Sequence, residues 1–235
     1  MPGPVALVGA GEFTPGMVAV DTALLAATGR HRPRVAILPT ASFPDGETIL
    51  RRWADLGADH FSALGAEVEA VLVRDRATAD DPEFAQAVGE ADLISLSGGK
   101  PGHLLRALRG SAVWRAAAAA HERGAVLVGC SAGAMALAGR QPELRGGRLP
   151  FPIRWEPALD VVAGTAVIPH YDRIPEPLAA LFALQAPSGT TVLGIDEGTA
   201  AVGRDGAWQV QGRARVTVWR GRHRTRHRAG ETFRI

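Results

Sequence analysis

Apolar strand candidates alternate with helix-length segments through the first two thirds of the chain. The strand candidates are the runs 5–8, 35–38, 68–72, 93–96 and 125–128, and helical patterns lie near 17–28, 46–64, 82–89 and 111–123. This alternation is typical of a parallel sheet whose two faces are covered by helices. The sequence therefore predicts an α/β fold with a doubly wound, mostly parallel sheet flanked by helices. In such sheets ligands bind at the carboxyl ends of the strands.

The last third of the chain has a looser pattern. Residues 139–152 are rich in Gly, Arg and Pro and indicate an exposed loop. A strand is expected over 163–169 and a helix over about 175–184. Beyond residue 190, short alternating runs separated by turn residues predict C-terminal antiparallel hairpins. We expect residues 1–235 to form a single domain that includes the hairpin segment of about 190–235.

The composition is that of a globular protein. With 235 residues, of which 46% are hydrophobic, the chain can bury one sizeable core. Its one cysteine excludes an internal disulfide framework, and its first residues lack the basic start and long apolar stretch of a signal peptide. No apolar run approaches the length that spans a membrane. We therefore expect a cytoplasmic protein that does not associate with membranes.

Positive charge is concentrated near the C-terminus, although the net charge of the chain is only +2. Seven arginines lie between residues 213 and 228, and Val216, Val218 and Trp219 are interleaved with them. The interleaving favours the solvated face of a hairpin, with a nucleic-acid-binding surface as the alternative. We expect no nucleic-acid partner.

A serine stands at the apex of a predicted strand-turn-helix segment. The apolar run 126–128 continues into the letters GCSAGA, which place Ser131 between Gly129 and Gly133. The pattern Gly-x-Ser-x-Gly is typical of a nucleophile elbow, where a sharp turn brings the residues two before and two after the serine nearly into contact. The helix expected from Ala132 directs its free N–H groups at an oxyanion forming there. Ser131 is the candidate nucleophile, and an ordinary glycine-rich turn is the alternative.

A serine nucleophile needs a base, and seven histidines are available. His170 ends the strand expected over 163–169, so we expect it at the same edge of the sheet as Ser131. A capping or packing histidine is the alternative for His170, and His103 is the second choice of base. Cys130 is the rival nucleophile, but it is out of register with the flanking glycines, so we interpret it as a packing residue.

A second glycine loop, with the letters SGGKPG, follows the strand expected over 93–96. Two successive glycines leave backbone N–H groups open to a substrate oxygen. The N–H of Gly98 or Gly99, together with that of Ala132, is expected to form an oxyanion hole with two donors. A plain strand-to-helix turn is the alternative, and the spacing of a phosphate-binding Walker loop is absent.

Together these motifs resemble a known family. The letters SGG at 97–99, GCSAGA at 129–134, PHY at 169–171 and GIDE at 194–197 occur in the order seen in the serine peptidases typified by peptidase E and cyanophycinase. The resemblance implies a fold like that of the class I glutamine amidotransferases, with a serine in place of their cysteine. It implies a single α/β hydrolytic domain acting as a dipeptidase or exopeptidase through an acyl-enzyme. Short acidic or isoaspartyl peptides are the substrates implied.

The resemblance also implies residue roles. Ser131 would be the nucleophile, His170 the base, and Gly99 with Ala132 the oxyanion donors. The triad acid would fix the tautomer of the imidazole. In the family it lies in the loop between the serine and the histidine, which favours Glu143. The alternatives are Asp172, at the His-x-acid spacing of the glutamine amidotransferases, and Glu156 and Asp160, in the same interval as Glu143.

The substrate is less constrained, because the chain departs from the family pattern. Cyanophycinases carry Asp-Gln before the histidine, whereas this chain has Ile168-Pro169, which argues against cyanophycin cleavage. Arg173 is a candidate for binding a substrate carboxylate, with surface ion pairing as the alternative, and Lys100 is a further substrate-binding candidate. No cofactor and no metal is implied. The partners expected are a small peptide substrate and a second copy of the chain in a homodimer.

Two other functions stay open. An esterase or amidase of the α/β-hydrolase type shares the elbow, but its usual His-Gly-Gly oxyanion loop is missing here. A nucleic-acid-binding protein that uses the arginine-rich tail would bind oligonucleotides in a strongly salt-dependent way.

Overall fold

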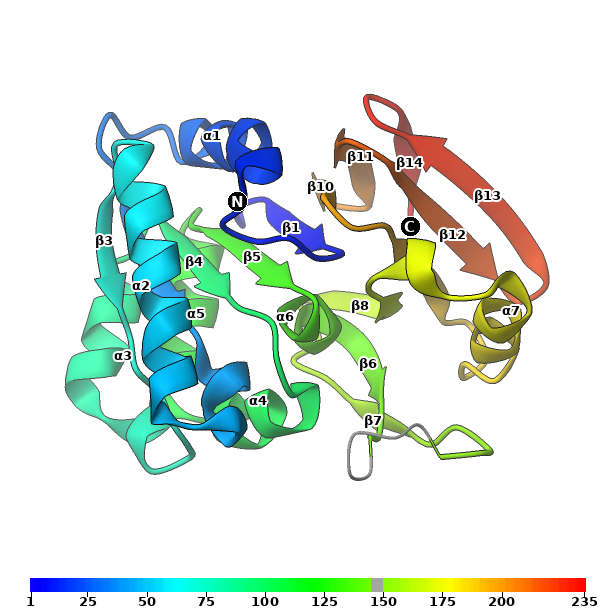
Figure 1. Cartoon of the computed structure of the whole chain (residues 1–235), viewed down its shortest axis with the longest axis horizontal. Helices are drawn as coiled ribbons and strands as arrows, with labels where there is room; N and C mark the ends of the chain where they lie inside the picture. The colour runs from blue at the N-terminus through cyan, green and yellow to red at the C-terminus, as the bar shows by residue number, and fades with distance from the viewer. Residues whose placement is uncertain (145–149) are drawn as a thin grey trace.

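A computed structural model of the chain describes residues 1–144 and 150–235 and contains two β-sheets (Figure 1). The first sheet has the strand order β14 (Thr232–Arg234), β11 (Ala207–Gly212), β10 (Thr199–Arg204), β1 (Val5–Val8), β5 (Val126–Cys130), β4 (Leu93–Leu96), β2 (Arg34–Leu38) and β3 (Glu67–Ala70). The second has the order β13 (His223–Arg228), β12 (Arg215–Arg220), β9 (Thr191–Ile195), β8 (Val162–Ile168), β6 (Ala138–Pro142) and β7 (Trp155–Pro157). Strands β1 to β5 are parallel to one another. The predicted doubly wound, mostly parallel α/β sheet is confirmed.

Helices cover both faces of the first sheet. In chain order, the α-helices of the described residues are α1 (Val18–Ala27), α2 (Glu47–Ala63), α3 (Pro82–Gly89), α4 (Pro101–Leu108), α5 (Ala112–Glu122), α6 (Ala132–Leu137) and α7 (Glu176–Leu184). Apolar side chains of α1 and α2 form one buried cluster with one face of the sheet. The other face packs against α3 to α6 and against the second sheet, whose far side is covered by α7. Among the described residues, no helix is both long enough and apolar enough to cross a bilayer.

The segment predicted to be an exposed loop from residue 139 begins instead with a strand. Strand β6 follows α6 directly and lies between β7 and β8, where Gly139 and Gln141 are buried. A Cβ at residue 139 would lie 2.9 Å from the backbone nitrogen of Gly164. The loop prediction was therefore wrong for 139–142, because the glycine allows two strands to approach closely and does not mark a turn. Of the same segment, 145–149 lie outside the described residues.

The predicted C-terminal hairpins are confirmed, but they are divided between the two sheets. Strand β11 pairs antiparallel with β10 and β14 in the first sheet, and β12 pairs antiparallel with β13 in the second. Strand β9 is antiparallel to β12 but parallel to β8. Beyond β9 the chain crosses to the first sheet, where the N–H of Gly198 donates to the carbonyl oxygen of Ala10 at 2.9 Å. The loops after β1, β8 and β9 are thereby brought together.

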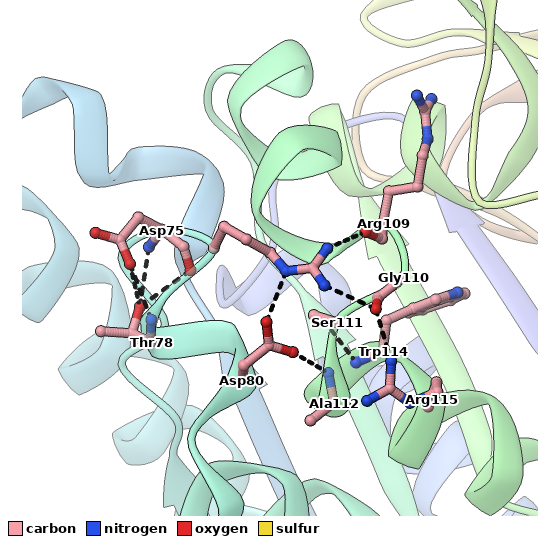
Figure 2. Close-up of polar contacts among 10 residues, drawn as sticks. Asp75, Thr78, Asp80, Arg109, Gly110, Ser111, Ala112, Trp114 and Arg115 are labelled. Atoms are coloured by element: carbon pink, nitrogen blue, oxygen red, sulfur yellow. Dashed lines mark hydrogen bonds and ion pairs between the residues drawn. The ribbon is translucent and has the colours of Figure 1, made fainter.

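Side chains fix the turn between α4 and α5, at the far end of the helix that follows the second glycine loop (Figure 2). Ser111 Oγ accepts a hydrogen bond from a backbone N–H in the first turn of α5, so it is an N-cap. Asp80 accepts from the N–H of Ala112 at 2.7 Å. Arg76 pairs with Asp80 and donates to two carbonyl oxygens just beyond α4. Helix α4 itself was not predicted, although Pro101 at its start is a typical first-turn residue.

Candidate active site

Ser131 lies at the apex of the sharp turn between β5 and α6. Its backbone has φ 50° and ψ −104°, a conformation that residues other than glycine rarely adopt. A Cβ at Gly129 would lie 2.5 Å from the carbonyl oxygen of Gly133, so these two residues meet across the turn. A Cβ at Gly133 would lie 2.2 Å from the carbonyl oxygen of Leu96 in β4. The second glycine is therefore required by the neighbouring strand as well as by the turn.

His170 reaches Ser131 from the second sheet. It follows β8 in the left-handed conformation, with φ 50°, and its backbone N–H donates to the carbonyl oxygen of Gly9 at 3.3 Å. Nε2 of its ring lies 3.0 Å from Ser131 Oγ. The side chain of His170 is 41% exposed, so the pair is accessible from solvent. The structure thus brings the predicted nucleophile and the predicted base into hydrogen-bond contact.

Glu197 occupies the other side of the imidazole. Its Oε1 lies 2.7 Å from Nδ1 of His170, and its side chain is 17% exposed. Two neighbours fix Glu197: Asp172 Oδ1 accepts a hydrogen bond from its backbone N–H at 2.8 Å, and Arg173 Nη2 donates to its Oε2 at 2.8 Å. The hydroxyl of Ser131, the imidazole of His170 and the carboxylate of Glu197 are therefore connected by two successive contacts. Glu197 is held through both its backbone and its side chain.

The acid beside His170 is not the one that the sequence analysis favoured. Glu143 follows β6, where its N–H donates to the carbonyl oxygen of Arg154 at 2.8 Å. In the sequence, Glu197 stands out only as part of the motif GIDE. A usable signal was present, because Glu197 follows the apolar run of β9 just as His170 follows that of β8. Parallel neighbours end at the same edge of a sheet, which brings the two side chains together.

The N–H groups expected to form the oxyanion hole have different environments. The N–H of Gly98 donates to Oε1 of Glu12 at 2.8 Å, so it is already engaged. The N–H groups of Gly99 and Ala132 donate no hydrogen bond to any other residue that the structure describes. Gly99 has φ +140°, and a Cβ there would lie 2.3 Å from the carbonyl oxygen of Ala41, so only glycine fits. Of the expected donors, Gly99 and Ala132 are the ones available to an oxyanion.

Both side chains predicted to bind substrate form ion pairs. Arg173 pairs with Glu197, and Lys100 Nζ lies 3.3 Å from Asp45 Oδ1. Each is more than half exposed, so neither is withdrawn from a ligand. Arg173 and the imidazole of His170 contact the two oxygens of the same carboxylate, that of Glu197, whereas Lys100 belongs to the glycine loop.

Arginines of β12 and β13 contact the body of the protein. Arg215 pairs with Asp196 at 3.1 Å, and Arg226 pairs at 2.9 Å with a glutamate of α7. The guanidinium carbon of Arg224 lies 5.3 Å from the centre of the Trp219 ring. These contacts agree with the hairpin interpretation of the arginine-rich segment. Within 1–144 and 150–235, no group of three or more His, Cys, Asp or Glu side chains is arranged to hold a metal ion.

Cys130 precedes Ser131 and is only 2% exposed. Its thiol donates to Oε2 of Glu12 at 2.6 Å. Burial, and then the neighbouring carboxylate of Glu12, raise the pKa of the Cys130 thiol well above its ordinary value. Because the thiolate is the reactive form of cysteine, this thiol is poorly suited to be the nucleophile.

We expect Cys130 to resist alkylation in the folded protein. The raised pKa keeps the thiol protonated through neutral pH and into the alkaline range, and burial excludes the reagent. At about pH 8, iodoacetamide should modify the native protein at least about tenfold more slowly than the chain unfolded in urea. Intact-mass measurements over time give both rates, and the unfolded chain is the control. Equal rates would contradict the assignment.

Comparisons with known proteins identify the family and the fold. Residues 5–210 match the model of Peptidase_S51, peptidase family S51. The crystal structure of a peptidase from an acI-B1 Actinobacterium is similar, with a TM-score of 0.88 and 31% sequence identity over 100% of this chain and 98% of that chain. A protein from Listeria monocytogenes EGD-e, named after peptidase E, has a TM-score of 0.63 and 17% identity over 98% of this chain and 100% of that chain. No curated protein matches the chain significantly. The expected fold, like that of class I glutamine amidotransferases, is confirmed.

Proposed function

The chain belongs to peptidase family S51, a family of serine-type peptidases, and we propose that Ser131, His170 and Glu197 form the catalytic triad of an enzyme that hydrolyses short peptides. The observation that carries the proposal is the line of contacts from Ser131 Oγ through the imidazole to Glu197, at 3.0 and 2.7 Å. The same constellation supports acyl transfer on several unrelated folds.

In the first half of the reaction, Nε2 of His170 takes the proton of Ser131 as Oγ attacks the peptide carbonyl carbon. The tetrahedral oxyanion accepts hydrogen bonds from the N–H groups of Gly99 and Ala132. The imidazolium then donates its proton to the leaving amine, and an acyl ester remains on Ser131. In the second half, His170 deprotonates a water molecule that attacks the ester, which releases the acid and restores the serine.

Glu197 gives the imidazole its direction and its tautomer. A carboxylate at Nδ1 keeps the proton on that nitrogen, so Nε2 is free to accept the proton of Ser131, and it stabilises the imidazolium that results. The contacts of Asp172 with the backbone N–H of Glu197 and of Arg173 with its Oε2 support the same role. We infer that Asp172, an alternative for the triad acid, positions that acid by holding its backbone.

We propose that the enzyme is a dipeptidase or exopeptidase whose substrates are small acidic or isoaspartyl peptides. Two exposed arginines beside the triad support this substrate class. Arg173 donates to Glu197 Oε2, and Arg213 Nε donates to the carbonyl oxygen of Glu197 at 3.3 Å. A guanidinium has five N–H donors, so each arginine retains donors for a second carboxylate. A substrate carboxylate bound there would lie close to His170, which suits a short peptide.

A peptide library tests the substrate class. We expect purified protein to cleave dipeptides and tripeptides with an Asp, Glu or isoaspartyl residue at least about tenfold faster, in kcat/KM, than the same peptides with Asn or Gln, because the amide removes a charge-assisted hydrogen bond. Release of free amines measures the rate. Versions blocked at the amino or the carboxyl terminus identify the end that is held. Equal rates for acidic and amide peptides would contradict the assignment of acidic substrates.

A further inference from the structure

Glu12, in the loop after β1, connects the two segments that supply the oxyanion donors. Its Oε1 accepts the N–H of Gly98 at 2.8 Å, and its Oε2 accepts the thiol of Cys130 at 2.6 Å. Gly98 directly precedes the donor Gly99, and Cys130 lies two residues before the donor Ala132. One carboxylate therefore ties the glycine loop to the nucleophile elbow.

The surroundings of Glu12 fit a carboxylate closely. A Cβ at Gly98 would lie 3.0 Å from Glu12 Oε1 and 3.4 Å from the Cβ of Ser131, so a side chain at this position would meet both groups. Burial keeps the thiol of Cys130 protonated, so it donates to the carboxylate and does not repel it. Each carboxylate oxygen of Glu12 therefore has a donor, one from each segment.

The glycine loop is held from its other end as well. The N–H of Lys100 donates to the carbonyl oxygen of Ala41 at 2.7 Å. Gly99 lies between this anchor and the one at Gly98, and two successive glycines restrict their own backbone torsions less than any other residues would. Without the bond to Glu12, the direction of the Gly99 N–H would be fixed on one side only. Oxyanion stabilisation depends on that direction, since losing one donor costs about a hundredfold to a thousandfold in turnover.

We propose that Glu12 is a positioning residue that sets the separation of the two oxyanion donors, and that Cys130 holds Glu12 in place. The catalytic consequence rests on the proposed function, because it requires an oxyanion at Ser131. Glu12 acts through the N–H of Gly98 and does not contact the substrate. The thiol next to the nucleophile thereby has a role as a hydrogen-bond donor.

Four variants separate the hydrogen bond from the charge. Glu12→Ala removes both acceptors, and we expect kcat to fall about tenfold to a hundredfold with KM changed less than about threefold. In Glu12→Gln the amide oxygen still accepts from Gly98 and the amide N–H faces the sulfur of Cys130, so kcat should stay within about threefold of the unchanged protein. Cys130→Ser keeps a donor and should be nearly neutral, whereas Cys130→Ala should lower kcat. Glu90→Ala, an exposed carboxylate in a surface pair with Arg34, is the control.

A peptide boronic acid, which becomes tetrahedral on the serine, reports on the oxyanion hole more directly than turnover. Its affinity should fall across the variants in proportion to kcat/KM, while melting temperatures measure any general loss of stability. Equal activity of Glu12→Ala and the unchanged protein would overturn the proposal. So would a Glu12→Gln variant as impaired as Glu12→Ala, because the charge and not the hydrogen bond would then matter.

A readout independent of catalysis distinguishes failure of this inference from failure of the proposed function. In the isotope-labelled full chain, we expect the amide proton of Gly98 to exchange slowly and to resonate downfield, as a charge-assisted hydrogen bond requires. Glu12→Ala should abolish both properties, and Glu12→Gln should retain the slow exchange. An unchanged Gly98 amide in Glu12→Ala would overturn the proposal whether or not the protein hydrolyses peptides.

Discussion

Replacing Ser131 with alanine should remove peptide hydrolysis almost completely. In the proposed mechanism the hydroxyl of Ser131 forms the acyl-enzyme, so kcat should fall about a millionfold, to the level that the oxyanion donors and substrate binding sustain alone. Covalent labelling by a fluorophosphonate should disappear in the same variant, because its phosphorus is attacked by Ser131 Oγ. Alanine adds no bulk to the turn, and circular dichroism and melting temperature confirm the fold.

Cys130→Ala provides the matched control at the adjacent position. It should keep its fluorophosphonate label, since we propose Ser131, which contacts His170, as the nucleophile and the thiol of Cys130 as a hydrogen-bond donor. Hydrolysis that persists in Ser131→Ala at the original rate would remove the triad from the mechanism. Loss of labelling in Cys130→Ala, with labelling kept in Ser131→Ala, would move the nucleophile by one residue.

Replacing Glu197 should produce the second-largest loss. In Glu197→Ala the imidazole loses the carboxylate at Nδ1, so its tautomer and orientation are no longer fixed, and kcat should fall about ten-thousandfold. The same substitution at Glu143, the acid favoured from the sequence, should leave kcat within about threefold. Asp172→Asn should fall between these limits, because it weakens only the support of the Glu197 backbone.

The two glutamates also distinguish the competing assignments of the acid. Rates are measured on one peptide under saturating conditions, and fluorophosphonate labelling counts the active sites in each preparation. A collapse of activity in Glu143→Ala, with the activity of Glu197→Ala nearly unchanged, would instead identify Glu143 as the triad acid. Equal, modest losses in both variants would mean that neither carboxylate orients His170.

The sequence was sufficient where function depends on one local pattern. The elbow at Ser131 could be predicted because its glycines, the preceding strand and the following helix are contiguous. His170 could be placed because it ends an apolar strand. Glu197 could not be assigned in this way, since its role depends on β9 lying beside β8 in a second sheet. The sequence beyond residue 190 predicts only antiparallel hairpins, so it does not indicate the parallel pairing of β9 with β8.

Long-range packing accounts for the other differences. The sequence of β6 predicts a loop because glycine usually marks a turn, whereas Gly139 is needed for a close approach to β8. Glu12 gave no signal at all from the sequence, because its partners Gly98 and Cys130 are 86 and 118 residues away. Contacts at that separation are decided by the order of strands in the sheet, which no local pattern specifies.

The proposed triad is assembled across the two sheets: the serine follows a strand of one, and the histidine and the glutamate follow strands of the other. In the proposed mechanism neither part acts alone, so activity depends on how the two sheets pack against each other. The hydrogen bond from the backbone N–H of His170 to the carbonyl oxygen of Gly9 connects the two sheets close to the side chains of the proposed triad. We therefore expect a substitution between the two sheets, remote from the substrate, to lower activity through a small relative shift of the sheets while both stay folded.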